Sequence, residues 1–150
     1  MASRVEGFDE AILCHAKNEF LEKGFNEASL RTIAQNAGVS TSTIYTRYSD
    51  KEGLFRYLVR PAAEGMRSYI DRALNGFESM PEEEQKEQHE AYADQGFPGL
   101  VDFIYSHFDA FKLIVTCAPN TFYHDFLESL VELDMNCTRN FLIQVKSRAY

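Results

Sequence analysis

The sequence is poor in cysteine, in long apolar runs and in alternating apolar patterns, and each absence excludes a class of protein. Its three cysteines are few and odd in number, which argues against a disulfide framework and for a reducing cytoplasm as the place of action. No apolar run approaches the roughly 18–20 residues that span a bilayer, so we expect no membrane partner. The first residues hold Glu6, Asp9 and Glu10 without an apolar core, which does not fit a secretory signal.

The motifs of common catalytic and metal sites are also absent from the sequence. It contains no G-x-S-x-G, no phosphate-binding glycine loop and no H-E-x-x-H. The histidines and cysteines of the C-terminal half, including His107, Cys117 and His124, match no zinc-ligand spacing. We therefore expect no catalytic residue, no metal site and no cofactor. A small helical enzyme that uses these three side chains stays open as an alternative.

The net charge of −8, taken over the whole chain, argues against a nucleic-acid partner, but its distribution changes that interpretation. Residues 1–60 carry eight basic and eight acidic side chains, whereas residues 61–150 carry seven and fifteen. Within residues 39–60 the basic side chains exceed the acidic ones by two. Such an asymmetry between halves indicates an interacting surface in the N-terminal part.

Helical spacing extends along the whole chain, and no segment alternates as a strand does. Apolar residues recur every four positions over residues 8–23, which predicts an amphipathic helix. Gly24 stands where a helix favours a left-handed residue at its C-terminus. We expect Phe25 to fold back onto that helix end.

Two short helices follow, each with a serine as its N-cap. Ser29 precedes a helix over residues 30–36, and Ser40 precedes one over residues 41–48. Gly38 lies in the turn between them, where a positive φ is needed. Three helices with a glycine turn between the second and the third have the sequence form of a helix-turn-helix.

A fourth helix opens at a capping box, the segment Ser49-Asp50-Lys51-Glu52, and keeps its apolar stripe to Phe77. We expect a kink or a break in it near Pro61. The acidic stretch 78–98 then predicts a linker with transient helix.

Two more helices are expected, from Leu100 to about Cys117 and from about Thr121 onward. The apolar pattern of the last one still runs at Tyr150, so the chain looks short at its C-terminus and incomplete. Left uncovered, its stripe would favour self-association. That stripe comprises Phe126, Leu130, Cys137, Phe141 and Val145.

The turn between the second and third helices defines the expected functional surface. A small Ala37 lets the two helices approach, and Val39 and Ile44 face inward. Short polar side chains then point outward, where they can reach groove edges and phosphates, with basic charge beside them. These outward residues are Thr41, Ser42, Thr43, Thr46, Arg47 and Lys51.

The segment FLEKGFNEASLRTIAQNAGVSTSTIYTRYSDKEGLF resembles the N-terminal DNA-binding domain of the TetR family of bacterial transcriptional regulators. The likeness covers about residues 8–58 and includes the turn glycine, the caps and the aromatic positions at fixed offsets. It implies that residues 41–47 form the recognition helix, that Tyr45 and Lys51 contact phosphates, and that Ser29 caps a helix whose N-terminus meets the DNA backbone. The sequence departs from the family at Thr41, where a basic residue is common, and at Ser42, where a glycine is common.

Base discrimination is expected in the hydroxyl side chains of the third helix, at Thr41, Ser42 and Thr46. A threonine offers a methyl group to a thymine and a hydroxyl to a base acceptor. Residues 41–46 contain no arginine or asparagine, so Arg47 is the one candidate for bidentate reading of guanine.

An effector pocket is expected among the aromatic helices of the C-terminal half. Packed against residues 58–77, their aromatic stripes would enclose an apolar cavity suited to a neutral or cationic molecule. The structural alternative is that these aromatic rings only fill a hydrophobic core. The expected lining comprises Phe103, His107, Phe108, Phe111, Phe122, Tyr123 and Phe126.

Together these inferences predict an all-α chain with a helix-turn-helix DNA-binding domain over residues 1–50 and a helical effector-binding and dimerisation domain over residues 51–150. The family resemblance implies a repressor that binds a double-stranded DNA operator as a homodimer and is released by a small-molecule effector. Besides a helical enzyme, a protein-interaction module that keeps the helix-turn-helix as a scaffold stays open.

Overall fold

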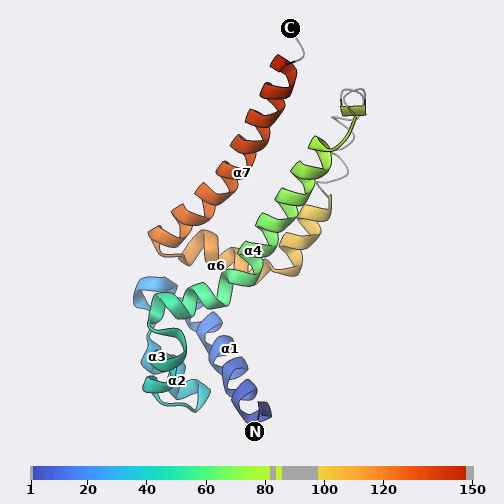
Figure 1. Cartoon of the computed structure of the whole chain (residues 1–150). Helices are drawn as coiled ribbons and strands as arrows, with labels where there is room; N and C mark the ends of the chain where they lie inside the picture. Colours follow the sequence, from blue (N-terminus) through green and yellow to red (C-terminus); the bar gives the residue numbers. More distant parts are fainter. Residues whose placement is uncertain (1, 82–83, 86–97, 148–150) are drawn as a thin grey trace. The chain divides into compact units, whose positions relative to one another are not determined.

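A computed structural model describes residues 2–81, 84–85 and 98–147 of the chain (Figure 1). The described residues form helices and contain no β-strand, which confirms the all-α class. Residues 98–106 are also helical. Most of the expected linker 78–98 lies outside the described residues. The helices are α1 (Ala2–Glu27), α2 (Leu30–Ala37), α3 (Thr41–Tyr48), α4 (Lys51–Glu78), α6 (Phe108–Cys117) and α7 (Asn120–Ser147).

None of the described helices is both long enough and apolar enough to cross a membrane.

The chain forms two compact units that do not follow its linear order. Unit 1 consists of Met1–Ala62 together with Phe108–Tyr123, and unit 2 consists of Ala63–His107 together with His124–Tyr150. Both α4 and α7 therefore contribute to each unit. The division at residues 50/51 was proposed on functional grounds and stays a prediction.

The core of unit 1 is built on the predicted apolar face of α1. Ile12, Ala16 and Phe20 are fully buried there. The Phe20 ring lies edge-on to Phe55 of α4, with 5.2 Å between ring centroids, and Phe55 meets Phe122 of α7 at 5.9 Å. The segment 108–123 thus completes the core around the first helix.

Helix α6 packs on α1 within this unit. Leu113 and Ile114 of α6 are buried. On the rim, Lys17 Nζ donates to Asp109 Oδ2 over 2.9 Å, and this carboxylate raises the pKa of Lys17. Because both partners are largely exposed, the ion pair contributes little to stability, and the burial of Leu113 and Ile114 holds α6 on α1.

Gly24 interrupts α1 where the sequence predicts the helix end. Its backbone has φ 74° and ψ 172°, outside the helical region, although the helical hydrogen bonding resumes to Glu27. The chain turns there so that the Phe25 ring stacks on Phe20, with 5.9 Å between centroids. The expected folding-back of Phe25 is confirmed.

Of the kink or break expected near Pro61, the break is wrong, because α4 is one helix from Lys51 to Glu78 with Pro61 inside it, while the kink stays a prediction. Proline removes the donor that would bond the carbonyl of Tyr57. Both Pro61 and Tyr57 are exposed, so water can satisfy that carbonyl and the helix continues.

The single helix expected from Leu100 to Cys117 is divided by a turn at His107. The carbonyl oxygen of Phe103 accepts hydrogen bonds from Ser106 Oγ at 2.8 Å and from His107 Nδ1 at 3.1 Å. The His107 amide bonds instead to the carbonyl of Ile104 at 3.2 Å. Local side chains therefore take the acceptor that a continuing helix would use.

The apolar stripe that was expected to be uncovered on α7 is partly covered. Phe126, Leu130 and Cys137 are half-buried, while the side chains of Phe141 and Val145 lie outside the described part. A different set of apolar side chains on α7 faces solvent, each 40–59% exposed: Leu127, Val131, Met135, Leu142 and Ile143.

Candidate nucleic-acid interface

Helix α2 begins and ends as the sequence predicts. The hydroxyl oxygen of Ser29 accepts the amide of Thr32 at 3.3 Å, which satisfies one free donor of the first turn. At the other end Gly38 adopts φ 68° and ψ 29°, and the Val39 amide reaches back to the carbonyl of Ala34 at 3.0 Å. This pattern closes the helix and turns the chain toward α3.

A buried carboxylate on α1 fixes the start of α2. Glu19 is only 6% exposed, and its Oε1 accepts the backbone amide of Ser29 at 3.1 Å and the Lys23 ammonium at 3.0 Å. This role of Glu19 was not predicted from the sequence. Its signal was an acid on the same face as Ala16 and Phe20, with a lysine four residues later.

Helix α3 is held by its inward side and capped by Ser40. The Ser40 hydroxyl oxygen accepts the amide of Thr43 at 3.2 Å, as the sequence predicts. Ile44 is fully buried and Tyr48 is 7% exposed, so the helix is anchored at its middle and at its end. The helices α2 and α3 lie side by side next to α1 in unit 1 (Figure 1).

The outward side of α3 is a surface of hydroxyl groups. Ser42, Tyr45 and Thr46 are exposed, with Tyr45 at 52%, whereas Thr41 and Thr43 are half-buried. The Thr46 hydroxyl donates to the carbonyl of Ser42 at 2.9 Å, which orients its methyl group as well. These five are the predicted contact residues of the third helix apart from Arg47, and the structure places them together on α3.

Arg47 faces α1 and not the open side of α3. Its Nη1 donates to Asp9 Oδ1, and the Tyr48 hydroxyl donates to the same oxygen at 3.0 Å. Burial, followed by the hydrogen bond to Asp9, raises the pKa of Tyr48. In the sequence Asp9 stands out only as an acid near the N-terminus, and this cluster was not predicted, because α1 and α3 meet only in the folded chain.

Lys51, predicted as a phosphate contact, also holds the loop between α1 and α2. Its ammonium donates to the carbonyl oxygens of Asn26 at 2.9 Å and Ala28 at 3.1 Å. It also lies 4.9 Å from the centroid of the Phe25 ring. Lys51 therefore places a cation beside the start of α2, the helix end that the family resemblance puts against the DNA backbone.

The turn from α3 to α4 corrects the predicted capping box. Ser49 has φ 70° and ψ −56°, and the Asp50 amide bonds to the carbonyl of Tyr48 at 2.9 Å, which together make a γ-turn. The N-cap of α4 is Asp50, whose Oδ1 accepts the Gly53 amide at 2.7 Å. Packing of Tyr48 shifts the cap by one residue from the expected Ser49.

Comparison with known families decides what this arrangement is. Residues 12–58 match the family described as bacterial regulatory proteins, tetR family. The segment 12–58 is therefore similar to the TetR family. The match contains the α2-turn-α3 segment and the beginning of α4, which are the elements that carry the predicted contacts.

A curated relative supports the same TetR-family assignment over a similar length. The chain is 42% identical over 50 residues to the HTH-type transcriptional repressor BepR of Brucella suis. The aligned part is 33% of this chain and 24% of the relative, so the chain spans about a quarter of that repressor's length.

Among solved structures, the chain is similar to native NalD, the secondary repressor of the MexAB-OprM multidrug efflux pump in Pseudomonas aeruginosa. Its identity to this chain is 22% and the TM-score is 0.45. The likeness covers 96% of this chain and 71% of that one.

The seven residues expected to line an effector pocket divide between the two units. In unit 2, the rings of Phe103 and His107 lie 4.5 Å apart. In unit 1, Phe111 and Phe122 are buried in the core, which fits the alternative that these two rings fill a core and line no pocket. Phe108 and Tyr123 also belong to unit 1, and Phe126 to unit 2. The expected pocket stays a prediction.

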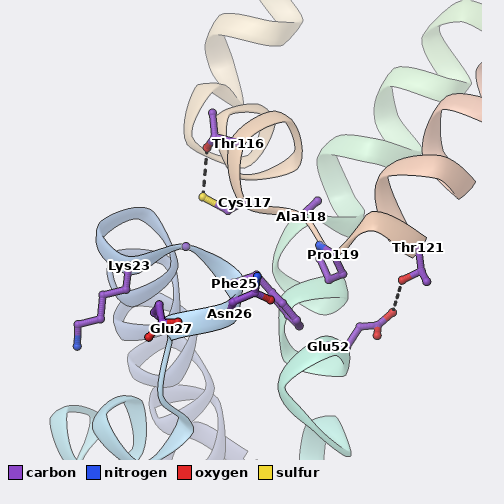
Figure 2. Close-up of a pocket in the computed structure, with 11 residues that line it drawn as sticks. Lys23, Phe25, Asn26, Glu27, Glu52, Thr116, Cys117, Ala118, Pro119 and Thr121 are labelled. Carbon is purple, nitrogen blue, oxygen red and sulfur yellow. Dashed lines mark hydrogen bonds between the residues drawn. The ribbon is translucent and has the colours of Figure 1, made fainter.

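Unit 1 contains an open pocket of about 600 Å³ that shares no residue with the expected lining. Figure 2 shows it between the end of α1 around Phe25, the first turn of α4 and the turn from α6 to α7. Thr121 Oγ1 donates to Glu52 Oε1 at 3.2 Å across its wall. The Glu52 carboxylate is also paired with Arg56, so the wall is tied to α4.

The three side chains of the alternative enzyme hypothesis do not all belong to one unit. Cys117 is in unit 1, where its thiol donates to the carbonyl of Phe20 at 3.4 Å. His107 and His124 are in unit 2, and His124 is exposed. Within the described part of the chain, no group of three histidine, cysteine or acidic residues is arranged to hold a metal ion.

Proposed function

We propose that this chain is a sequence-specific DNA-binding transcriptional regulator that acts in the cytoplasm as a repressor, and that it is not an enzyme. The observation that carries the proposal is the outward side of α3, within the TetR-family domain. Ser42, Tyr45 and Thr46 are exposed on a helix whose opposite side is anchored by buried Ile44 and Tyr48. A rigid helix with exposed hydroxyl groups suits insertion into a major groove.

Phosphate contacts in this proposal come from the edges of the same surface. Tyr45 offers its hydroxyl from α3, Lys51 offers its ammonium beside the loop 26–28, and Ser29 marks the N-terminus of α2. Such contacts fix the register on the duplex, whereas base edges are read from α3.

The proposal includes a homodimer and a small-molecule effector. Two-fold docking places paired recognition helices in successive major grooves about 34 Å apart, and a ligand that changes their spacing removes simultaneous contact. The exposed apolar side of α7 supports the homodimer, because it offers a surface to a second copy of the chain. The residues that would bind the effector stay a prediction from the sequence.

Selection of bound duplexes from random DNA, at a stated salt concentration and after size fractionation, tests the proposal. We expect the chain to enrich a symmetric motif. The Tyr45→Ala variant should bind all duplexes about tenfold more weakly, because one phosphate hydrogen bond is worth about 1–1.5 kcal/mol.

The matched control is Tyr105→Ala, which removes a tyrosine that is 71% exposed on the helical segment 98–106 of unit 2. It should bind like the wild type. A wild-type chain that enriches no duplex, or equal losses in the two variants, would contradict DNA binding through α3.

A further inference from the structure

The only guanidinium on α3 is already engaged inside the protein. Arg47 Nη1 and the Tyr48 hydroxyl both donate to Asp9 Oδ1, so two neighbouring residues of α3 converge on one oxygen of α1. The side chain of Arg47 is 25% exposed and that of Asp9 is 38% exposed. A charge-assisted bond at a partly shielded site is stronger and better oriented than one in open solvent.

The position of Arg47 on the helix adds a second argument. Recognition helices contact base edges with their N-terminal residues, whereas Arg47 lies in the last turn of α3, beside buried Tyr48. Bidentate reading of guanine uses two donors of the guanidinium fork. To present them, Arg47 would have to leave Asp9 and expose a carboxylate near the DNA phosphates.

We propose that Asp9 and Arg47 are positioning residues that tie the end of α3 to α1, and that Arg47 does not read a base. This inference rests on the proposed DNA binding and assigns its specificity. With Arg47 withdrawn, base discrimination depends on the hydroxyl side chains Thr41, Ser42 and Thr46. The pair Asp9–Arg47 sets how α3 is turned about its own axis, because Ile44 anchors the middle of the helix and the pair anchors its end.

The test combines duplex selection with a double-mutant cycle on the full chain. Arg47→Lys keeps a cation for Asp9 but has no planar fork, so we expect the wild-type base preference and affinity within about threefold. Arg47→Ala and Asp9→Asn should each weaken binding to the selected duplex. The double variant should bind no more weakly than the weaker single variant, because both changes break one interaction.

Circular dichroism melting of every variant checks that the protein remains folded, and Arg72→Ala, an exposed arginine on α4 in unit 2, is the matched control. If Arg47→Lys loses a guanine preference at one symmetric position, or if the two single effects simply add, the inference is wrong while DNA binding stands. A wild-type chain that selects no duplex would instead refute the proposed function itself.

Discussion

Gly53, in the first turn of α4, lies against the backbone at the end of α3, and this position leaves no room for a side chain. A Cβ added at Gly53 would stand 1.9 Å from the carbonyl oxygen of Tyr48, whereas real Cβ atoms keep at least 3.0 Å from such atoms. The backbone would have to open by the difference, 3.0 minus 1.9, or 1.1 Å. The atom in the way is backbone, so no side-chain rotation relieves the clash.

The Gly53→Ala variant should therefore be destabilised by about 2 kcal/mol. Overpacking of this kind costs about 3 kcal/mol, and the higher helix propensity of alanine offsets about 1 kcal/mol of it. For a unit of this size the melting temperature would fall by roughly 8–16 °C. The strain would act on the γ-turn at Ser49 and on the Asp50 cap, so DNA affinity should fall with stability.

Urea unfolding followed by circular dichroism measures this change, and Gly65→Ala serves as the control. Gly65 lies on the same helix, and its added Cβ would meet Cζ at the far end of the Phe103 side chain at 2.5 Å, an atom that a small change of χ1 moves away. We expect the control to lose less than half as much stability. Equal stability of Gly53→Ala and the wild type would refute the close approach of α4 to Tyr48.

The remaining predictions concern the same surface. Ser49→Gly should raise the free energy of unfolding by about 0.5–1 kcal/mol, because glycine accepts the positive φ without strain; an unchanged or lower value in urea unfolding would contradict this. Lys51→Ala should weaken binding to all duplexes alike and flatten the salt dependence by about one unit, and an unchanged slope in a salt titration would mean that Lys51 contacts no phosphate. Thr46→Ala should change the selected sequence at one symmetric position, whereas an unchanged preference would move the reading to other residues or to DNA shape. The pKa of Tyr48 is raised in the folded chain above its ordinary 10.0, so the unfolded chain loses that proton first as the pH rises. The contribution of Tyr48 to the free energy of unfolding should therefore be fully present below pH 10 and be lost above it. In pH-dependent urea unfolding, this fall should be shallower for Tyr48→Phe.

Features that depend on neighbouring residues were predicted well from the sequence. The caps Ser29 and Ser40 and the left-handed Gly38 are found where the pattern puts them, since each involves only three or four consecutive residues. The helix α3 even has its expected bounds of 41–48. Local hydrogen-bond chemistry is sufficient for such elements.

Features that depend on distant contacts were missed. The γ-turn at Ser49 follows from the burial of Tyr48, and the roles of Asp9 and Glu19 follow from the packing of α1 against α3 and the start of α2. The residue spacing around Arg47 in the sequence does not indicate that its partner, Asp9, lies in the first helix. The same limit explains why residues 108–123 were assigned to the C-terminal half, although they complete the core of unit 1.

The discontinuity of unit 1 has a consequence for how the protein is made. During synthesis the N-terminal domain emerges from the ribosome long before Phe122, whose ring covers Phe55, and before the buried side chains of α6. Its core is therefore complete only after the chain has been translated as far as Tyr123. Until then Phe20 and Phe55 are incompletely covered, because the residues that contact them from α6 and α7 have not yet been synthesised. A change that slows translation in this interval would lengthen the time during which chaperones can bind the exposed aromatic side chains.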